Sequence, residues 1–305
     1  MKKYLLVVAL FLSATVLPAH AAITPAKAVS DIPPSIAVID TGLNGMWFNN
    51  SLVAEACFLE YGNCINGKTT MEGPGAATLP ATTNTALDHG SQMVSIIKRV
   101  NPSAKIVFIR IVGVTPKGDP YLYTLKAVRM ALDWVIANQA KYNISVVNIS
   151  QGAIIGNCDV PVGMPKQITD LKAINVPVVV ATGNAGNRTK INSPACLTDT
   201  VSVGATDNPW TGAGTLEYNR DAKPYIARYS NGNNTTDFYL NGRWNVTNLN
   251  NTTKFMVGTS NAAASMSAWW LLNKKATFDE TYNAFATGAT IASNEWLTGR
   301  YIQLP

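Results

Sequence analysis

Hydrophobic residues follow two alternating patterns along the 305-residue chain. Continuous apolar runs bounded by turn residues are typical of buried strands. Such runs predict strands at 35–40, 105–112, 145–150, 176–182 and 201–205. Apolar residues spaced three or four positions apart are typical of amphipathic helices. This spacing predicts helices at 90–100, 122–140, 165–174 and 260–274.

The alternation of buried strands with helices predicts an α/β fold, in which a parallel sheet is covered by helices on both faces. Residues 206–256 interrupt the alternation because they are polar and rich in asparagine, and we expect surface loops and hairpins there. The chain has no internal repeat and no clear linker. We therefore expect one domain over residues 22–305, with the Pro- and Ala-rich residues 22–34 as an exposed lead-in.

The first 21 residues have the pattern of a secretory signal peptide. Lys2 and Lys3 precede an apolar stretch over residues 4–17, and Ala19-His20-Ala21 is a small-x-small cleavage site. The alternative is a membrane anchor, but the apolar run is shorter than the roughly 20 residues that a spanning helix needs. We expect a protein exported from a bacterial cell, periplasmic or secreted, without a membrane anchor.

Composition narrows the classes of partner. Hydrophobic residues make up 47% of the chain and charged residues 14%, which excludes a charged disordered protein. The formal charge of +6 falls to +4 without Lys2 and Lys3, because residues 1–21 contain no acid. Lysine and arginine form no run or basic stripe, so we expect no nucleic-acid partner. Of the two histidines, only His89 remains after removal of the signal peptide.

The four cysteines, Cys57, Cys64, Cys158 and Cys196, predict two disulfides in an oxidising compartment. Three pairings are possible. We favour Cys57–Cys64 with Cys158–Cys196, because the first two are close in sequence. A metal site is disfavoured, since there is no C-x-x-C motif, His89 is the only available imidazole and the acidic residues are sparse. We expect neither a metal nor a cofactor.

Two candidate catalytic residues, Asp40 and His89, lie at predicted element ends. Asp40 ends a predicted strand, where ligands of parallel sheets bind. Its alternative role is that of a turn-forming aspartate. His89 lies in the first turn of a predicted helix, and its alternative role is that of a packed or solvated histidine. Asp88 is expected to be the N-cap of this helix, with its carboxylate accepting from a backbone N–H.

Two further candidates, Asn184 and Ser260, occupy similar positions. Asn184 follows a predicted strand between two glycines, and its alternative role is that of an asparagine in a left-handed turn. Ser260 lies where a loop becomes an apolar helix, and its alternative role is that of an N-cap serine.

Together the four side chains supply every role of a serine hydrolase. A serine hydroxyl becomes a nucleophile when a base takes its proton, and histidine suits that task near neutral pH. A buried carboxylate holds the imidazole in the required tautomer, and an amide donor stabilises the oxyanion. The sequence therefore indicates Ser260 as nucleophile, His89 as base, Asp40 as orienting carboxylate and Asn184 as oxyanion donor.

With their flanking residues, these positions resemble the motifs of the subtilisin-like serine proteases, the subtilase family. Asp40 lies in V-I-D-T-G, and His89 lies in H-G-S-Q-M-V-S-I-I, which is similar to the family's H-G-T-x-V-A-G. Asn184 lies in A-T-G-N-A-G, and Ser260 lies in G-T-S-N-A-A-A, which is similar to G-T-S-M-A-x-P. The order Asp, His, Asn, Ser along the chain is also the family's order.

Other segments extend the resemblance over about residues 35–273. N-I-S-Q-G at 148–152 resembles the family's N-x-S-x-G strand, which pairs with extended peptide and so implies substrate-binding roles for Ser150, Gln151 and Gly152. The resemblance implies a three-layer subtilisin-like fold with a mostly parallel central sheet flanked by helices. It also implies a secreted serine endopeptidase that cleaves protein or peptide substrates through an acyl-enzyme. We expect a monomer.

The chain also departs from the family pattern. Ala264 replaces a proline, Asn261 replaces a methionine, Ser95 replaces a glycine and Gln151 stands where an apolar residue often lies. Only residues 22–39 separate the predicted signal peptide from Asp40, so we expect no prodomain of several dozen residues. These departures motivate an alternative function: a subtilase-fold pseudoenzyme that binds extended peptides without turnover.

Overall fold

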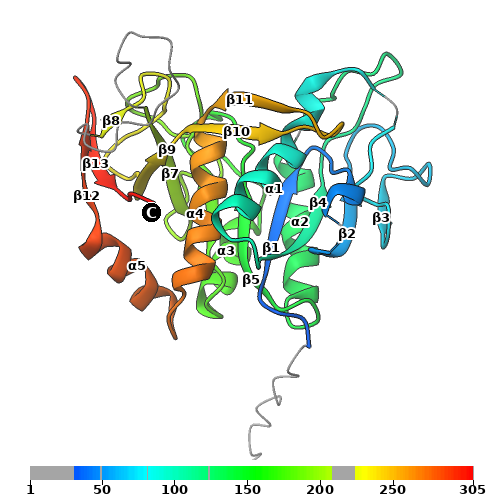
Figure 1. The fold of residues 1–305 in the computed structure, drawn as a ribbon, viewed down its shortest axis with the longest axis horizontal. Coiled ribbons are helices and arrows are strands. Elements are labelled where there is room, and N and C mark those ends of the chain that lie inside the picture. Colours follow the sequence, from blue (N-terminus) through cyan, green and yellow to red (C-terminus); the bar gives the residue numbers. More distant parts are fainter. Residues whose placement is uncertain (1–30, 49, 81, 123, 208–223, 305) are drawn as a thin grey trace, which may run out of the picture.

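The computed structural model describes residues 31–48, 50–80, 82–122, 124–207 and 224–304. Helices α1–α5 and the thirteen strands of these residues are arranged around one large sheet (Figure 1). The strands are β1 (Ser35–Asp40), β2 (Leu52–Phe58), β3 (Thr70–Glu72), β4 (Lys105–Arg110), β5 (Ile144–Ile149), β6 (Val178–Ala181), β7 (Val201–Asp207), β8 (Tyr225–Ile226), β9 (Phe238–Asn241), β10 (Arg243–Thr247), β11 (Thr253–Val257), β12 (Thr290–Ser293) and β13 (Thr298–Tyr301).

The large sheet has eleven described strands in the order β3-β2-β4-β1-β5-β6-β7-β8-β12-β13-β9, and β7 also pairs with β9. Strands β2, β4, β1, β5, β6 and β7 form a continuous parallel block. Antiparallel pairs within this sheet are β2–β3, β7–β8 and β12–β13. Strands β10 and β11 form a separate hairpin. The mostly parallel central sheet predicted from the sequence is therefore confirmed.

Five α-helices accompany the described strands. They are α1 (His89–Val100), α2 (Leu125–Asn138), α3 (Met164–Ala173), α4 (Thr259–Asn273) and α5 (Phe278–Gly288). Two short 3-10 helices, η1 (Gly45–Phe48) and η2 (Thr85–Asp88), lie in the connections that follow β1 and β3. Helices α1 and α4 cover one face of the sheet, and α2 and α3 cover the other (Figure 1).

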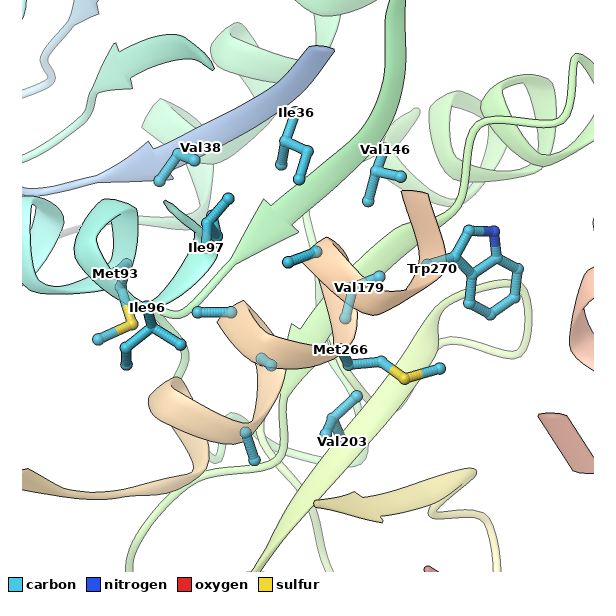
Figure 2. Packing of buried hydrophobic residues seen from close by; sticks show 14 of the residues in the cluster. Ile36, Val38, Met93, Ile96, Ile97, Val146, Val179, Val203, Met266 and Trp270 are labelled. Carbon is cyan, nitrogen blue, oxygen red and sulfur yellow. The ribbon is translucent and has the colours of Figure 1, made fainter. Parts of the chain in front are cut away.

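The parallel strands are buried on both faces, which explains their continuous apolar sequences. On one face, alternate residues of β1 such as Ile36 and Val38 belong to the buried cluster that also contains Met93 of α1 and Met266 of α4 (Figure 2). On the other face, Ala37 and Ile39 belong to the cluster that includes the apolar sides of α2 and α3. Because successive strand side chains point to opposite faces, one strand contributes to both cores.

Gly90 allows α1 to approach the end of β1 closely. A Cβ atom at this position would collide with the backbone oxygen of Gly42 and with the ring of Phe108. The glycine therefore lets the first residue of the helix, His89, lie next to the last residue of the strand, Asp40.

The predicted elements from 35 to 205 and at 260–274 all exist, with ends that differ by at most three residues. The largest difference is at α2, which begins at Leu125 rather than at 122, because the Thr124 side chain accepts the N–H of Ala127 as an N-cap. Sequence reasoning did not assign β2 and β3, or the C-terminal α5, β12 and β13.

The prediction of surface loops and hairpins for 206–256 is correct for the β10–β11 hairpin but wrong for β9. Phe238, Tyr239 and Leu240 of β9 are fully buried, and the strand extends the large sheet next to β7. The polar residues around these three obscured a short buried strand. Residues 208–223 of the same stretch, like the predicted signal peptide at 1–21, lie outside the described residues.

Both disulfides have the favoured pairing. Cys57 at the end of β2 is bonded to Cys64, and Cys158 is bonded to Cys196. Within the part of the chain that the structure describes, no helix combines the length and apolar character needed to cross a bilayer. The same residues contain no cluster of three or more His, Cys, Asp or Glu side chains suited to a metal ion.

Candidate active site

The predicted site residues meet at one edge of the sheet. Asp40 ends β1, Ser150–Gly152 follow β5, and Asn184 follows β6. His89 is the first residue of α1, and Ser260 is the second residue of α4. Because β1, β5 and β6 are adjacent and parallel, their carboxyl ends lie side by side. Ligands of open α/β sheets bind outside these carboxyl ends of the strands.

Asp40 and His89 form a direct hydrogen bond. His89 Nδ1 lies 2.8 Å from Asp40 Oδ1, and the Asp40 side chain is completely buried. Thr41 reinforces the arrangement, because its backbone N–H donates to the same Asp40 oxygen over 2.7 Å. Nδ1 faces Asp40, so Nε2 on the opposite side of the ring is free to act as a base toward the cleft that His89 lines.

The ion pair governs the protonation of His89. Burial of the imidazole disfavours its charged form, but the negative charge and the hydrogen bond of Asp40 outweigh burial. The pKa of His89 is therefore raised above its ordinary value of 6.5, even though nearby Lys254 opposes the shift. A raised pKa makes the imidazole a stronger base.

Asp88 does not play its predicted part in capping α1. It occupies the N-cap position, but its carboxylate makes no capping hydrogen bond. Thr41 supplies an acceptor instead, since its hydroxyl oxygen receives the backbone N–H of Gly90 over 2.9 Å and donates to the Leu87 carbonyl oxygen over 2.8 Å. The residue that follows β1 thus satisfies the start of the helix and fixes it against the strand end.

Ser260 is bonded to Ser150 in this structure rather than to His89. The Ser260 hydroxyl donates to the backbone oxygen of Ser150 over 3.1 Å, and the Ser150 hydroxyl donates back to the Ser260 backbone oxygen over 3.1 Å. Ser260 and His89 line the same cleft. A contact between them requires rotation of the serine side chain, a change that is common when catalytic hydrogen bonds tighten on substrate binding.

Asn184 is held so that its amide nitrogen is available. Its Oδ1 accepts the backbone N–H of Thr259 over 2.9 Å and the Thr259 hydroxyl over 3.0 Å. These bonds fix which end of the amide carries the NH₂ group. The backbone N–H of Ser260 lies in the first turn of α4, where N–H groups have no partner within the helix. Two donors at a helix N-terminus suit a developing negative charge.

The loop that carries Asn184 is anchored by buried Asn231. The Asn231 Oδ1 accepts the backbone N–H groups of Ala185 and Asn187, and its Nδ2 donates to the carbonyl oxygen of Thr182. The side chain therefore replaces backbone partners that an irregular loop lacks.

His89, Asn184 and Ser260 line a cleft of about 410 Å³. Its other lining residues include Val112, Tyr121 and the exposed Leu122 on one side. Asn192 occupies the space between Gly152 and Gly183, since a Cβ at either glycine would collide with its side chain. Among the described lining residues, only His89 and Tyr121 have titratable side chains.

The structure brings together all seven predicted catalytic, oxyanion and substrate-binding residues as lining or immediate neighbours of this cleft. Asp40 lies behind His89, and Ser150, Gln151, Gly152, Asn184 and Ser260 line the cleft. Sequence reasoning missed the roles of Thr41, Asn192 and Thr259. Thr41 and Thr259 are the chain neighbours of Asp40 and Ser260, so the motifs could have pointed to them. No sequence signal indicates that the Asn192 side chain lies between two glycines.

Comparison with known proteins agrees with this geometry. The sequence model of the subtilase family matches residues 33–291. Among solved structures, a cold-adapted subtilisin-like serine proteinase is 18% identical with a TM-score of 0.63, covering 90% of this chain and 89% of that chain. The prenylagaramide maturation protease PagA is 19% identical with a TM-score of 0.61, covering 87% and 86%. A lanthipeptide protease is 18% identical with a TM-score of 0.56, covering 84% and 81%.

These likenesses establish a subtilisin-like fold, and the family match extends over most of the chain. The chain therefore belongs to the subtilase family and, with it, to the serine-type endopeptidases.

Proposed function

We propose that this chain is an exported endopeptidase in which Ser260, His89 and Asp40 form the catalytic triad. The observation that carries the proposal is the 2.8 Å hydrogen bond between His89 Nδ1 and Asp40 Oδ1, beside a cleft that Ser260 and Asn184 also line. The buried carboxylate fixes the tautomer in which Nε2 is unprotonated and can accept the serine proton.

In the first half of the reaction, the Ser260 hydroxyl leaves the Ser150 carbonyl, and His89 Nε2 takes its proton as Oγ attacks the peptide carbonyl carbon. The carbonyl oxygen becomes an oxyanion held by the Ser260 N–H and by Asn184 Nδ2. The protonated His89 then gives its proton to the leaving amine, and the C–N bond breaks. An acyl-enzyme on Ser260 remains.

In the second half, a water molecule gives its proton to His89 Nε2 and attacks the acyl carbon. The ester bond to Ser260 breaks, and the serine regains its proton from His89. Asp40 stays ionised throughout and stabilises the imidazolium that forms in each half.

The cleft supports extended protein or peptide substrates with uncharged side chains near the scissile bond. Residues 150–152 follow the central strand β5 and offer backbone groups to an extended peptide. The lining carries no Asp, Glu, Lys or Arg among the described residues. We infer that charged substrate side chains would lose hydration there without gaining an ionic partner.

The proposal includes export of a monomer after removal of residues 1–21, with residues 22–305 as one catalytic unit. Two disulfides support an oxidising compartment. N-terminal sequencing of the exported protein should begin at Ala22, and sedimentation should give the mass of one chain.

A pseudoenzyme that binds peptides without turnover is the competing function, and one observation favours it: the Ser260 hydroxyl donates to Ser150 rather than to His89. The two functions differ in whether Ser260 reacts. A serine-directed phosphonate should label the wild-type protein at Ser260 and should not label Ser260→Ala.

A peptide-library digest completes the test. The wild-type protein should cleave internal bonds, while Ser260→Ala should bind the same peptides without cleaving them. Peptide binding by both proteins, with neither labelling nor cleavage by the wild type, would establish the pseudoenzyme instead.

A further inference from the structure

Gln151 contacts the Asp40–His89 pair directly. Its side-chain Nε2 lies 3.1 Å from Asp40 Oδ1 and 3.1 Å from His89 Nδ1. Gln151 follows β5, so it reaches the pair from a different strand than Asp40, which ends β1.

Chemistry fixes which end of the Gln151 amide faces Asp40. An ionised carboxylate only accepts hydrogen bonds, and within an amide only the nitrogen can donate. With the amide reversed, Oε1 would lie against a carboxylate oxygen and both would be acceptors. The amide nitrogen therefore faces Asp40.

The hydrogen bonds of Asp40 are concentrated on one oxygen. Oδ1 accepts from the Thr41 backbone over 2.7 Å, from His89 over 2.8 Å and from Gln151 over 3.1 Å. Among the described residues, no donor reaches the buried Oδ2. The orientation of the carboxylate, and with it that of the imidazole, thus depends on Thr41 and Gln151.

We propose that Gln151 is a positioning residue for the Asp40–His89 pair, whose amide holds the carboxylate in the orientation that the imidazole requires. This inference rests on the proposed function, since positioning matters only if His89 acts as the base. It also revises the role in substrate binding that the family resemblance implied for Gln151.

The amide also has an electrostatic effect that a substrate-selecting side chain would not need. Its hydrogens carry partial positive charge, and its nitrogen lies 3.1 Å from Nδ1 of the imidazole, whose ring becomes cationic when His89 is protonated. Within the described part of the chain, the charged groups that act on His89 are Asp40 from β1 and Lys254 from β11, and Asp88 is its chain neighbour. Gln151 therefore opposes protonation of His89 directly. Because the Thr41 N–H still holds the same Asp40 oxygen when Gln151 is replaced, the Asp40–His89 bond should persist, and removal of the amide should raise the pKa of the imidazole.

The test is an NMR titration of His89 in the full chain with Gln151→Met, which replaces the amide with an apolar side chain of similar length. A His20→Gln background leaves His89 as the only histidine. We expect the His89 pKa to rise by about half a unit. At a pH below that pKa, the fraction of His89 with a neutral imidazole then falls by about threefold. The acid limb of kcat/KM should move by the same amount, with KM for short peptides unchanged. Gln151→Leu is the second variant and should show the same shift.

Gln92→Met is the matched control. Gln92 lies on α1 with His89 and is buried, but it donates to Asn248 Oδ1 over 2.8 Å and contacts neither triad residue. It should leave the His89 pKa unchanged. If Gln151→Met and Gln151→Leu also leave it unchanged and instead raise KM, the positioning role is wrong and Gln151 binds substrate.

The titration needs no turnover, so it is independent of the proposed function. A protein that is not labelled at Ser260 but shows the His89 shift would contradict the proposed function while supporting the contact that Gln151 makes.

Discussion

Ser260 and Ser150 each donate a side-chain hydrogen bond to the other's backbone oxygen, over 3.1 Å in both directions. The Ser150 hydroxyl also accepts Nδ2 of buried Asn148 over 3.1 Å, and Asn148 Oδ1 accepts the Ser267 hydroxyl over 3.0 Å. This network joins the end of β5 to two turns of α4. It therefore sets the position of Ser260 relative to the strand that leads into the cleft.

Ser150→Ala should destabilise the protein because it leaves the buried amide donor of Asn148 without its acceptor. A buried group that loses its partner costs about 1–3 kcal/mol. Chemical denaturation should show this loss. The double variant Asn148→Ala/Ser150→Ala should cost less than the sum of the single variants, because the orphaned donor is gone. Strictly additive costs would mean that the network has no energetic role.

Proteolytic activity should increase with pH through a midpoint above 6.5. Asp40 raises the pKa of His89 above that value against the effect of burial, and only the neutral imidazole accepts the serine proton. The pH dependence of kcat/KM measures this midpoint, and Asp40→Asn should move it to lower pH. A midpoint below 6.5 in the wild type would contradict the raised pKa.

The same raised pKa has a consequence for stability. Protonated His89 is favoured in the folded state, so its contribution to stability is fully present below the unfolded pKa of about 6.5 and is lost as pH rises through the folded pKa. The difference in unfolding free energy between wild type and His89→Gln should therefore be larger at pH 5.5 than at pH 9.

Asn184→Ala should reduce kcat with little change in KM. In the proposed mechanism the amide stabilises the oxyanion, which exists only after attack, so its loss should cost roughly 10²–10³ in kcat, a size measured in another member of this same family. Thr259→Val is an informative companion, because it removes one of the two bonds that orient the amide and should give a smaller loss in the same direction. A rise in KM of the same size with kcat unchanged would instead indicate that Asn184 binds the substrate already in the ground state.

Asn192→Ala should broaden the cleft and change its specificity. The Asn192 side chain fills the space between Gly152 and Gly183, next to the oxyanion residue Asn184. Its removal should raise kcat/KM by roughly tenfold for substrates with a larger apolar side chain at the residue whose carbonyl is attacked. Anchoring of the loop should persist, since Asn231 keeps its bond to Thr182. An unchanged peptide-library profile would exclude Asn192 from specificity.

The two disulfides should differ in their contribution to stability. Cys158–Cys196 joins residues 38 apart and Cys57–Cys64 joins residues 7 apart. From loop-closure entropy, we expect losses of about 4 kcal/mol and about 2.5 kcal/mol when each pair is replaced by alanine. Denaturant unfolding of the two double variants measures both values. A larger loss for the shorter loop would show that native-state packing outweighs chain entropy.

Much of the central fold was predictable because its signals are local. Continuous apolar runs identified β1, β4, β5, β6 and β7, since strands buried on both faces consist mainly of apolar residues. Strand β9 was missed because three apolar residues among asparagines form too short a pattern. The C-terminal α5 was missed although Thr277 and Glu280 form a capping box, because its apolar face is narrow.

Within the site, the identity of the side chains was predictable but several of their partners were not. Asp40, His89, Asn184 and Ser260 lie in recognisable local motifs. The cap that Thr41 provides to α1, the bond from Gln151 to Asp40 and the bond from Ser260 to Ser150 join residues 49 to 111 positions apart. The hydrophobic periodicity of a sequence does not indicate such contacts, because they depend on the distances between strands and helices in the folded protein.

The amino-acid sequence by itself determined the central strands, the helices packed on them and the candidate catalytic side chains, because hydrophobic period and motif residues act over a few neighbouring positions. Only the tertiary structure decided that one Asp40 oxygen receives three donors, that Ser260 rests on Ser150 and that Asn192 occupies the cleft between two glycines. The reason is that hydrogen bonds and steric fit between distant parts of the chain are lost when atoms move by about 1 Å, and tertiary packing sets those positions.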